Sequence, residues 1–198
     1  MAEAGRVIAG SAGGIRLLAP GAGTRPLADR VKQAVFATLE PDLPGAAVLD
    51  LFAGSGAAAI ESLSRGAARA VLVEHDAGAV RVIRENLRRA SVVDRAVVVR
   101  RDVLRYLAMG PDETPGAEWP FDLVIVDPPY AERAIREAVL ARLGSPDPGL
   151  PAIVRPGGRV VATCFWKEPP PVEAGLLASE RTRRFGETAV VFYRHGDS

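Results

Sequence analysis

Two short segments of the sequence combine acidic side chains with residues that bend the backbone, and the first spans residues 48–56. An apolar run there contains Asp50, and Gly54 and Gly56 follow, separated by one serine. Glycines with this spacing let the backbone turn tightly and bring its N–H groups close to a ligand. A carboxylate beside such a turn repels phosphate and attracts a cation. The segment therefore favours a nucleoside ligand with a positively charged amino-acid arm, of which S-adenosylmethionine is the obvious one.

The glycine spacing alone leaves other interpretations open. Gly54, Gly56 and Ala59 also fit the loose G-x-G-x-x-G/A fingerprint of dinucleotide-binding proteins. The segment is equally compatible with an ordinary connection from a strand to a helix. A decision between these interpretations needs a second motif.

Acidic residues recur where predicted strands stop, and four carboxylates at one edge of a sheet are costly unless they bind something. Glu74 lies about twenty residues beyond the glycine turn, where a carboxylate accepts ribose hydroxyls. Asp102, with the backbone N–H of Val103, is placed to contact the adenine edge, although it could simply cap the following helix. The predicted cofactor-binding residues are Asp50, Phe52, Ala53, Gly54, Gly56, Glu74, Asp102, Val103 and Asp127.

The second segment is Asp127-Pro128-Pro129-Tyr130, the most specific motif in the chain. The prolines fix an extended turn and remove two N–H donors. The Asp127 carboxylate and the Pro128 carbonyl can then accept both hydrogens of a planar –NH₂ group, which aims the nitrogen lone pair at a methyl donor. Tyr130 offers a ring on which a base stacks. We expect these four residues to be catalytic, with Asp127 orienting the amine and accepting a proton only after methylation has made the amine acidic.

The rest of the sequence alternates predicted strands and helices. Strands are expected at residues 46–50, 70–74, 96–100, 121–126 and 158–165, helices at 56–65, 77–89 and 132–143, and a final antiparallel pair at 181–184 and 188–194. Continuous apolar strands that alternate with helices indicate a mostly parallel sheet covered on both faces. Ligands bind at the carboxyl ends of such strands, which is where the acidic residues fall.

Residues 1–40 are predicted to form a small extension, and residues 41–198 the catalytic domain. Two short apolar runs within residues 6–20 indicate a β-hairpin outside the main core, and residues 29–39 indicate a helix with one apolar face. The extension is locally basic, which indicates either a solvated surface or a site for RNA phosphates. The candidate RNA-binding residues are Arg6, Arg16, Arg25, Arg30 and Lys32.

Composition excludes several classes of protein. Lys and Arg number 25 and Asp and Glu 24, so the formal net charge of +1 does not by itself indicate a nucleic-acid partner. A single cysteine, Cys164, and two histidines exclude a disulfide framework and a cysteine–histidine zinc site, and we expect no metal. No apolar run is long enough to span a membrane, and no signal peptide opens the chain. We therefore expect a cytoplasmic protein.

With these motifs, the chain resembles the class I S-adenosylmethionine-dependent methyltransferases and, within them, the bacterial 16S rRNA guanine-N2 methyltransferase family called RsmD. The narrower resemblance depends on motifs near both ends of the chain: Arg6 to Gly10, Thr24 to Pro26, Asp29 to Lys32 with Phe36, and Arg184 to Thr188. It implies a Rossmann-like, seven-stranded, mostly parallel sheet with helices on both faces. It also implies methylation of guanine N2 at position 966 of 16S rRNA, on the small ribosomal subunit, and we expect a monomer.

One departure from the family concerns the predicted hairpin. The family often has lysine, tryptophan and arginine between the hairpin glycines, whereas residues 11–15 of this chain carry no charge. An RNA contact would then depend more strongly on Arg25, Arg30 and Lys32.

Other functions remain open from the sequence. Similar corner motifs occur in methyltransferases that act on amino groups of DNA or of other RNAs, or on protein glutamine. A nicotinamide-dependent oxidoreductase would use the same fold but has no use for residues 127–130. A noncatalytic RNA-binding or assembly factor could retain a vestigial cofactor pocket. Binding of NADH without binding of S-adenosylmethionine would select the oxidoreductase.

Overall fold

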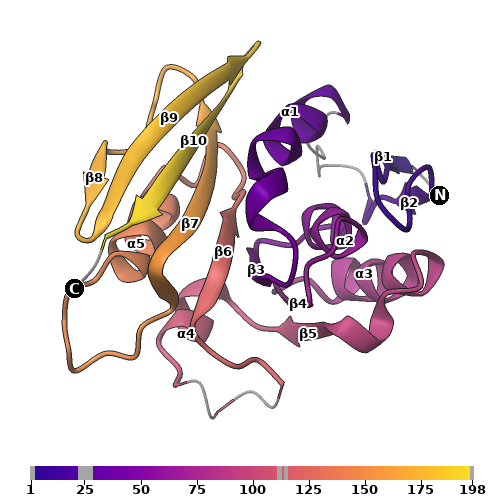
Figure 1. Ribbon diagram of the computed structural model, residues 1–198, viewed down its shortest axis with the longest axis horizontal. Helices are drawn as coiled ribbons and strands as arrows, with labels where there is room; N and C mark the ends of the chain where they lie inside the picture. The colour runs from indigo at the N-terminus through magenta and orange to yellow at the C-terminus, as the bar shows by residue number, and fades with distance from the viewer. Residues whose placement is uncertain (1–2, 22–28, 111–112, 114–115, 197–198) are drawn as a thin grey trace. The chain divides into compact units, whose positions relative to one another are not determined.

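The structure, a computed structural model, describes residues 3–21, 29–110, 113 and 116–196 (Figure 1). The chain forms two compact units, Met1–Asp102 and Val103–Ser198. The predicted extension, residues 1–40, therefore falls inside the first unit. Asp50, Glu74 and the glycine turn also belong to this first unit, whereas the segment Asp127 to Tyr130 belongs to the second.

The first unit is built on three parallel strands in the order β5-β4-β3. The strands are β3 (Ala47–Leu51), β4 (Arg69–Glu74) and β5 (Ala96–Arg100), and the helices α2 (Ala57–Ser64) and α3 (Ala77–Arg89) connect them. Every residue of β3 is buried, which explains its continuous apolar sequence. Asp50 pairs with Leu72, and Leu51 with Val73, so the carboxyl ends of β3 and β4 meet at the same edge of the sheet. The predicted strand–helix alternation is confirmed here.

The N-terminal hairpin consists of β1 (Glu3–Arg6) and β2 (Arg16–Leu18), and the helix α1 (Asp29–Leu39) and the 3₁₀ turn η1 (Glu40–Asp42) follow it. The hairpin was predicted outside the main core, and this is wrong. Leu17 is fully buried, and the Glu61 carboxylate of α2 accepts the N–H groups of Ile8 and Ala9 at 2.7 and 3.1 Å. The buried Asn86 side chain of α3 bonds both the N–H and the carbonyl of Leu18, at 2.8 and 2.9 Å. Buried polar side chains therefore fix the hairpin to the two helices.

Replacing Gly10 by alanine is expected to loosen this attachment. Gly10 and Gly14 both have a left-handed backbone, with φ of +84° and +87°, so alanine costs about 1–2 kcal/mol of strain at either position. At Gly10 the new Cβ would in addition clash with Ser64 O, at 1.9 Å. At Gly14 nothing lies within 4 Å of the new Cβ. In urea unfolding, Gly10→Ala should lose roughly 2 kcal/mol more than the matched control Gly14→Ala. Equal losses would contradict the close packing of the hairpin on α2.

The second unit contains five strands in the order β6-β7-β10-β9-β8. The strands are β6 (Phe121–Val126), β7 (Val154–Phe165), β8 (Glu173–Ala174), β9 (Leu177–Phe185) and β10 (Thr188–His195), and the helices are α4 (Val103–Leu107) and α5 (Arg133–Leu143). Strand β6 is parallel to β7, and the pairs β7–β10, β10–β9 and β9–β8 are antiparallel. In Figure 1, β9 and β10 form a long hairpin beside β7. Gly186, with φ of +61°, makes its turn.

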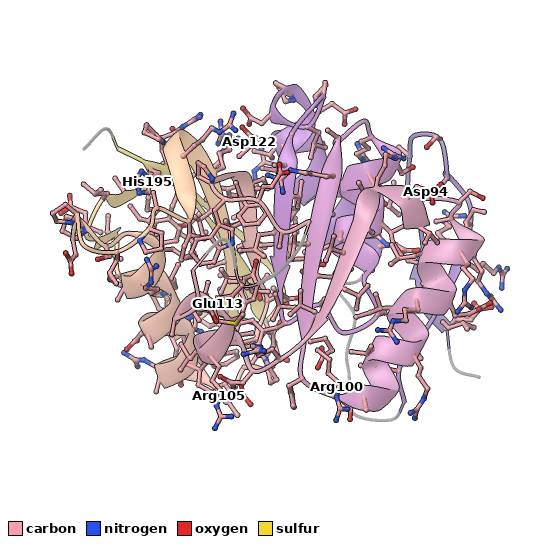
Figure 2. All side chains as sticks on the ribbon, turned by 90° about the horizontal axis from the view of Figure 1, so that it is seen from below. Asp94, Arg100, Arg105, Glu113, Asp122 and His195 are labelled. Atoms are coloured by element: carbon pink, nitrogen blue, oxygen red, sulfur yellow. The ribbon has the colours of Figure 1, made fainter. Side chains whose placement is uncertain are left out.

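The fold is of the predicted α/β, Rossmann-like class, with mostly parallel strands next to an antiparallel hairpin. The bounds of α3, β5 and β6 are the predicted ones, because strong apolar patterns and clear turns delimit them. The two-residue strand β8 was not predicted, since it is too short to show a period. A 3₁₀ turn, η2 (Val93–Arg95), leads into β5, whose last residue, Arg100, is labelled in Figure 2.

Candidate functional site

The glycine turn after β3 is held in a strained, left-handed conformation. Phe52, Gly54 and Gly56 have φ values of +65°, +56° and +76°. A non-glycine residue such as Phe52 rarely adopts this region, and such residues concentrate at ligand sites. The turn is fixed by the Ala53 N–H, which donates to Val73 O at 3.0 Å, and by the Gly56 N–H, which donates to Ala53 O at 2.7 Å. Around Gly54 the space is open, because a Cβ there would have only Phe52 O, at 3.8 Å, within 4 Å.

Glu74, at the end of β4, connects the turn to the start of α3. Its Oε2 accepts the Gly54 N–H at 2.9 Å, and its Oε1 accepts the Asp76 N–H at 2.8 Å. Asp76 in turn caps α3, since its Oδ1 accepts the Ala79 N–H at 2.7 Å. Glu74 is 7% exposed. His75 Nδ1 also lies 3.2 Å from its Oε1, whereas Oε2 keeps a second lone pair for a ribose hydroxyl. Glu74 therefore both shapes the turn and can bind a nucleoside.

Asp50 places a buried negative charge beside the same turn. The residue is 2% exposed, and its Oδ2 accepts the Ala59 N–H of α2 at 3.1 Å. Burying a carboxylate is costly unless it is paired or hydrogen-bonded, and the helix N–H supplies part of that compensation. Together, the open backbone at Gly54 and the carboxylates of Asp50 and Glu74 fit the ribose and the cationic arm of S-adenosylmethionine.

Asp102 and Val103 lie between the two units in the sequence. Asp102 is exposed and lies two residues after the end of β5. Arg101, which lies between β5 and Asp102, donates its N–H to Glu74 O at 3.1 Å. Val103 is buried and begins α4. Their contact with the adenine edge stays a prediction.

The segment after β6 has the polar groups that the motif predicted, with two hydroxyl partners that the sequence did not reveal. The Thr163 hydroxyl of β7 donates to Asp127 Oδ1. Among the described residues, Asp127 Oδ2 and the Pro128 carbonyl have no hydrogen-bond partner. Tyr130 is 38% exposed, and its hydroxyl shares a hydrogen bond with Thr188 of β10. The hydroxyls thus fix Asp127 and Tyr130, and two acceptors remain for an amine.

Burial raises the pKa of the Asp127 carboxyl above its ordinary value, and the hydrogen bond from Thr163 opposes this shift only in part. A raised pKa makes the carboxylate a better proton acceptor than an exposed aspartate, whose pKa is about 3.9. The motif therefore has a stronger base than the sequence alone indicated.

The raised pKa predicts how stability changes with pH. In the folded protein Asp127 binds its proton more tightly than in the unfolded chain, so its contribution to stability is lost as pH rises from the ordinary pKa through the folded one. We expect Asp127→Asn, which removes the charge of this half-buried carboxylate, to melt at a higher temperature than the wild type at about pH 8, with the difference shrinking toward about pH 4. Thermal melts across this range check it, and a variant that is equally destabilised at every pH would contradict it.

The predicted RNA-binding residues of the N-terminal segment differ in exposure. The prediction that Lys32 binds RNA is wrong. Lys32 is 2% exposed, its ammonium donates to Arg6 O, and burial lowers its pKa. Arg6 and Arg16 are exposed but pair with Asp29 and Glu3, at 3.8 and 2.9 Å. Arg30 is exposed, and Arg25 lies outside the described residues. The exposed basic surface here is therefore smaller than predicted.

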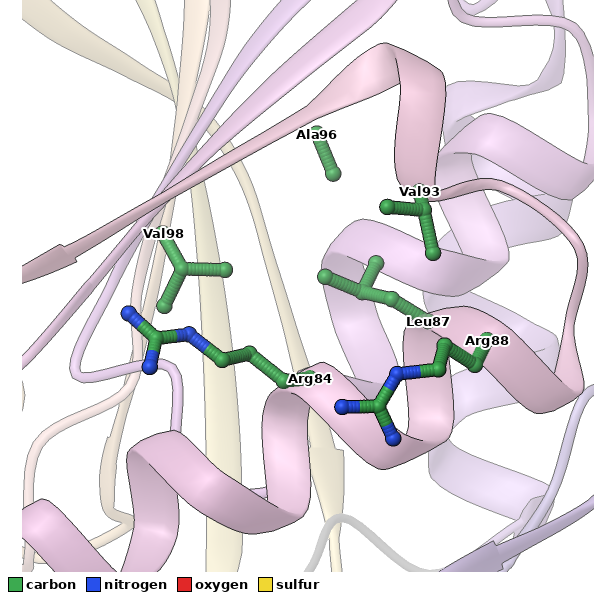
Figure 3. A pocket seen from close by; sticks show the side chains of 6 residues that line it. All are labelled: Arg84, Leu87, Arg88, Val93, Ala96 and Val98. Atoms are coloured by element: carbon green, nitrogen blue, oxygen red, sulfur yellow. The ribbon is translucent and has the colours of Figure 1, made fainter.

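A shallow pocket lies on the first unit between α3 and β5 (Figure 3). It is lined by Arg84, Leu87, Arg88, Val93, Ala96 and Val98. None of these is a predicted site residue, and no carboxylate lines it. The pocket is thus separate from the glycine turn in its residues and its chemistry.

Two further properties concern the described part of the chain. Across residues 3–21, 29–110, 113 and 116–196, no group of three or more His, Cys, Asp and Glu side chains is arranged to hold a metal ion. Within the same residues, none of the helices combines the length and the apolar character that crossing a membrane requires.

The residues that hold other site or hairpin residues in place by hydrogen bonds were not predicted from the sequence. Thr163 and Thr188 hold Asp127 and Tyr130, and Glu61 and Asn86 hold the hairpin. Thr163 stands in a buried apolar strand, and Glu61 and Asn86 on buried helix faces. A polar residue at a buried position is the signal that could have indicated Thr163, Glu61 and Asn86.

The chain is similar to known methyltransferases. The chain is 33% identical to YlbH of Bacillus subtilis (strain 168), described as a candidate rRNA methyltransferase, over 96% of this chain and 98% of that protein. It is 36% identical to the ribosomal RNA small subunit methyltransferase D of Escherichia coli (strain K12), over 68% of this chain and 64% of that protein. A solved structure of yhhF from Escherichia coli, described as a candidate methyltransferase, matches with a TM-score of 0.83, 27% identity and 98% of both chains.

Fold and site together define a class I S-adenosylmethionine-dependent methyltransferase. A family model described as "Conserved hypothetical protein 95" matches residues 5–194, nearly the whole chain. The chain belongs to this family, which is the RsmD type of the class.

Proposed function

We propose that this chain transfers a methyl group from S-adenosylmethionine to the exocyclic N2 amine of a guanine in 16S ribosomal RNA, on the small ribosomal subunit. The observation that supports this most strongly is Asp127, whose Oδ1 is held by Thr163 while its Oδ2 and the neighbouring Pro128 carbonyl remain without donors among the described residues. Two acceptors side by side suit the two hydrogens of an –NH₂ group. The names of YlbH and of methyltransferase D favour ribosomal RNA as the carrier of that amine.

One set of residues is proposed to bind the cofactor, and another to bind the target amine. S-adenosylmethionine, when bound, supplies a methyl group attached to a positively charged sulfur. Glu74 and the Gly54 backbone bind the nucleoside, and the Asp50 carboxylate attracts the cationic arm. Asp127 and Pro128 accept the amine hydrogens, so that the nitrogen lone pair, no longer delocalised into the ring, is directed at the methyl carbon. Most of the rate enhancement then comes from positioning.

Proton transfer follows methylation. A neutral aryl amine is a very weak acid, but the methylated, positively charged amine is a strong one. Asp127 Oδ2, whose carboxyl pKa is raised by burial, accepts the released proton. Tyr130 is proposed to stack on the guanine ring, with its hydroxyl fixed by Thr188.

The finer features of the function rest on the sequence. Position 966 of 16S rRNA is proposed from the family resemblance, and contacts of Asp102 and Val103 with adenine from their place after β5. Arg30, which is exposed, is proposed to meet RNA phosphates, together with Arg25. A monomeric, cytoplasmic protein without a metal stays a prediction.

Calorimetry followed by methyl transfer tests the proposal. We expect S-adenosylmethionine to bind and NADH not to bind. With tritium in the methyl group, label should enter small subunits purified from a strain that lacks the gene, and should not enter duplex DNA. Binding of NADH alone would select an oxidoreductase, label in DNA a DNA methyltransferase, and cofactor binding without any transfer a noncatalytic factor.

A further inference from the structure

In the N-terminal segment Arg6 and Arg16 are paired and Lys32 is buried, whereas a second basic group in the other unit has no such pairing among the described residues. It consists of Trp166 and Lys167, which follow β7, and of Arg184, near the end of β9. We call it the Trp166 cluster. Among the described residues, neither Lys167 nor Arg184 forms an ion pair with a carboxylate. Their positive charges are therefore available to an external anion.

The Trp166 cluster is held in a fixed geometry. The Arg184 guanidinium carbon lies 3.5 Å from the centroid of the Trp166 ring, and Lys167 Nζ lies 5.4 Å from it. The Arg184 Nε–H donates to Gly186 O at 2.9 Å. The Trp166 N–H donates to Glu187 O at 3.0 Å, which ties the end of β7 to the hairpin turn. A guanidinium stacked on an aromatic face, with its remaining N–H groups free, is pre-organised to bind a planar or tetrahedral oxyanion such as phosphate.

The same hairpin turn is connected to the catalytic segment. Thr188, the first residue of β10, bonds the Tyr130 hydroxyl and pairs across the sheet with Phe165 and Phe185. Residues directly opposite one another on antiparallel strands project from the same face, so the two half-buried phenylalanines flank the residue that holds Tyr130. Trp166 and Arg184 adjoin these phenylalanines in sequence and, because successive side chains of a strand alternate between its faces, they project from the opposite face of the hairpin end. The end of the hairpin thus carries the Trp166 cluster on one face and, on the other, Thr188, which holds the side chain proposed to stack on the target base.

We infer that the Trp166 cluster binds the sugar–phosphate backbone of the RNA next to the modified nucleotide, with Arg184 and Lys167 contacting phosphate. This inference rests on the proposed function, which supplies a single-stranded RNA whose target base is exposed. Aromatic side chains interleaved with cations are the common means of holding such strands. An RNA strand that passes over the end of the hairpin would contact Arg184 and Lys167 on one face, and Phe165 or Phe185 beside Tyr130 on the other.

The test measures binding of a short single-stranded RNA oligonucleotide by fluorescence anisotropy over a range of salt concentrations. Each phosphate contact on a single strand contributes about 0.7 to the slope of log K against log salt. Arg184→Gln and Lys167→Gln should each reduce the slope by about that amount and weaken binding by about three- to thirtyfold. Arg194→Gln is the matched control: it removes one charge from the same hairpin, but Arg194 is paired with Glu180 at 3.1 Å. We expect its slope to match that of the wild type.

The outcomes separate this inference from the proposed function. Calorimetry with S-adenosylmethionine should give the wild-type affinity for all three variants, which also shows that they are folded. If wild type methylates small subunits while Arg184→Gln and Lys167→Gln keep the wild-type slope, or if Arg194→Gln reduces it equally, the inference about the cluster is overturned and the proposed function stands. If wild type transfers no methyl group to RNA, the proposed function fails and the inference fails with it.

Discussion

Replacing Asp127 by alanine is expected to slow methyl transfer by about 10²–10³-fold while the affinity for S-adenosylmethionine stays within a few-fold of the wild type. The carboxylate is the group that orients the amine and takes its proton, and removal of one pre-organised group of this kind costs about 10²–10³ in rate. Glu74, Asp50 and the glycine turn, which we assign to the cofactor, are left in place. Single-turnover transfer to small subunits measures the rate, and calorimetry measures the affinity.

The neighbouring Asp122 provides a matched control for this variant. Asp122 lies on β6, the strand that Asp127 directly follows, and pairs with Arg155 at 2.7 Å, so Asp122→Asn changes a β6 carboxylate outside the motif. We expect this variant to retain transfer. Thr163→Val, which removes only the hydroxyl that holds Asp127 Oδ1, should give an intermediate loss of rate. Loss of cofactor binding in Asp127→Ala, with transfer per bound cofactor unchanged, would contradict the assigned role.

Glu74→Gln is expected to weaken binding of S-adenosylmethionine by about thirtyfold or more, with little effect on RNA binding. Both oxygens of Glu74 accept backbone N–H groups, from Gly54 and Asp76. A glutamine has one acceptor oxygen, so its amide nitrogen would face one of these N–H groups and leave it unsatisfied, at a cost of about 1–3 kcal/mol. The ribose would in addition lose a charged acceptor.

The control for Glu74 is Glu85→Gln, on the exposed side of α3, where the carboxylate pairs with Arg89 at 3.4 Å. Calorimetry should give wild-type affinity for this variant. Equal affinity of Glu74→Gln and wild type would show that the carboxylate does not contact the cofactor. The assignment of the neighbouring turn at Gly54 to the nucleoside would then also lose its support.

The parts of the fold that the sequence predicts well are those decided by local pattern. Strand β6 is a mostly buried run that ends at Val126, just before Asp127, and α3 has an apolar stripe and the Asp76 cap. Both have the predicted bounds, because burial and capping act over neighbouring residues. The glycine turn was also predictable, since positive φ at Gly54 and Gly56 requires a residue without a side chain.

The parts that could not be predicted depend on partners far apart in the chain. Lys32 was interpreted as an exposed cation, yet its ammonium is buried against Arg6 O, 26 residues away in sequence. Thr163 lies 36 residues from Asp127, and Asn86 lies 68 from Leu18. No local pattern predicts such pairs. The spacing of apolar residues shows which face of a helix or strand is buried, but not which distant residue packs against that face. The most important of these pairs is the hydrogen bond from the Thr163 hydroxyl to Asp127 Oδ1, since it determines which carboxylate oxygen remains for the amine.

The chemical identity of the methylated atom tests the central claim most directly. Small subunits from a strain that lacks the gene would be incubated with the protein and S-adenosylmethionine, and the 16S rRNA digested and analysed by liquid chromatography with mass spectrometry. The account predicts that N2-methylguanosine appears with wild type and, over the same incubation time, is reduced by at least about 10²-fold with Asp127→Ala. A methyl group on a ring carbon, on a ribose oxygen or on another base would contradict the assignment of Asp127 and Pro128 to the two hydrogens of a guanine amine.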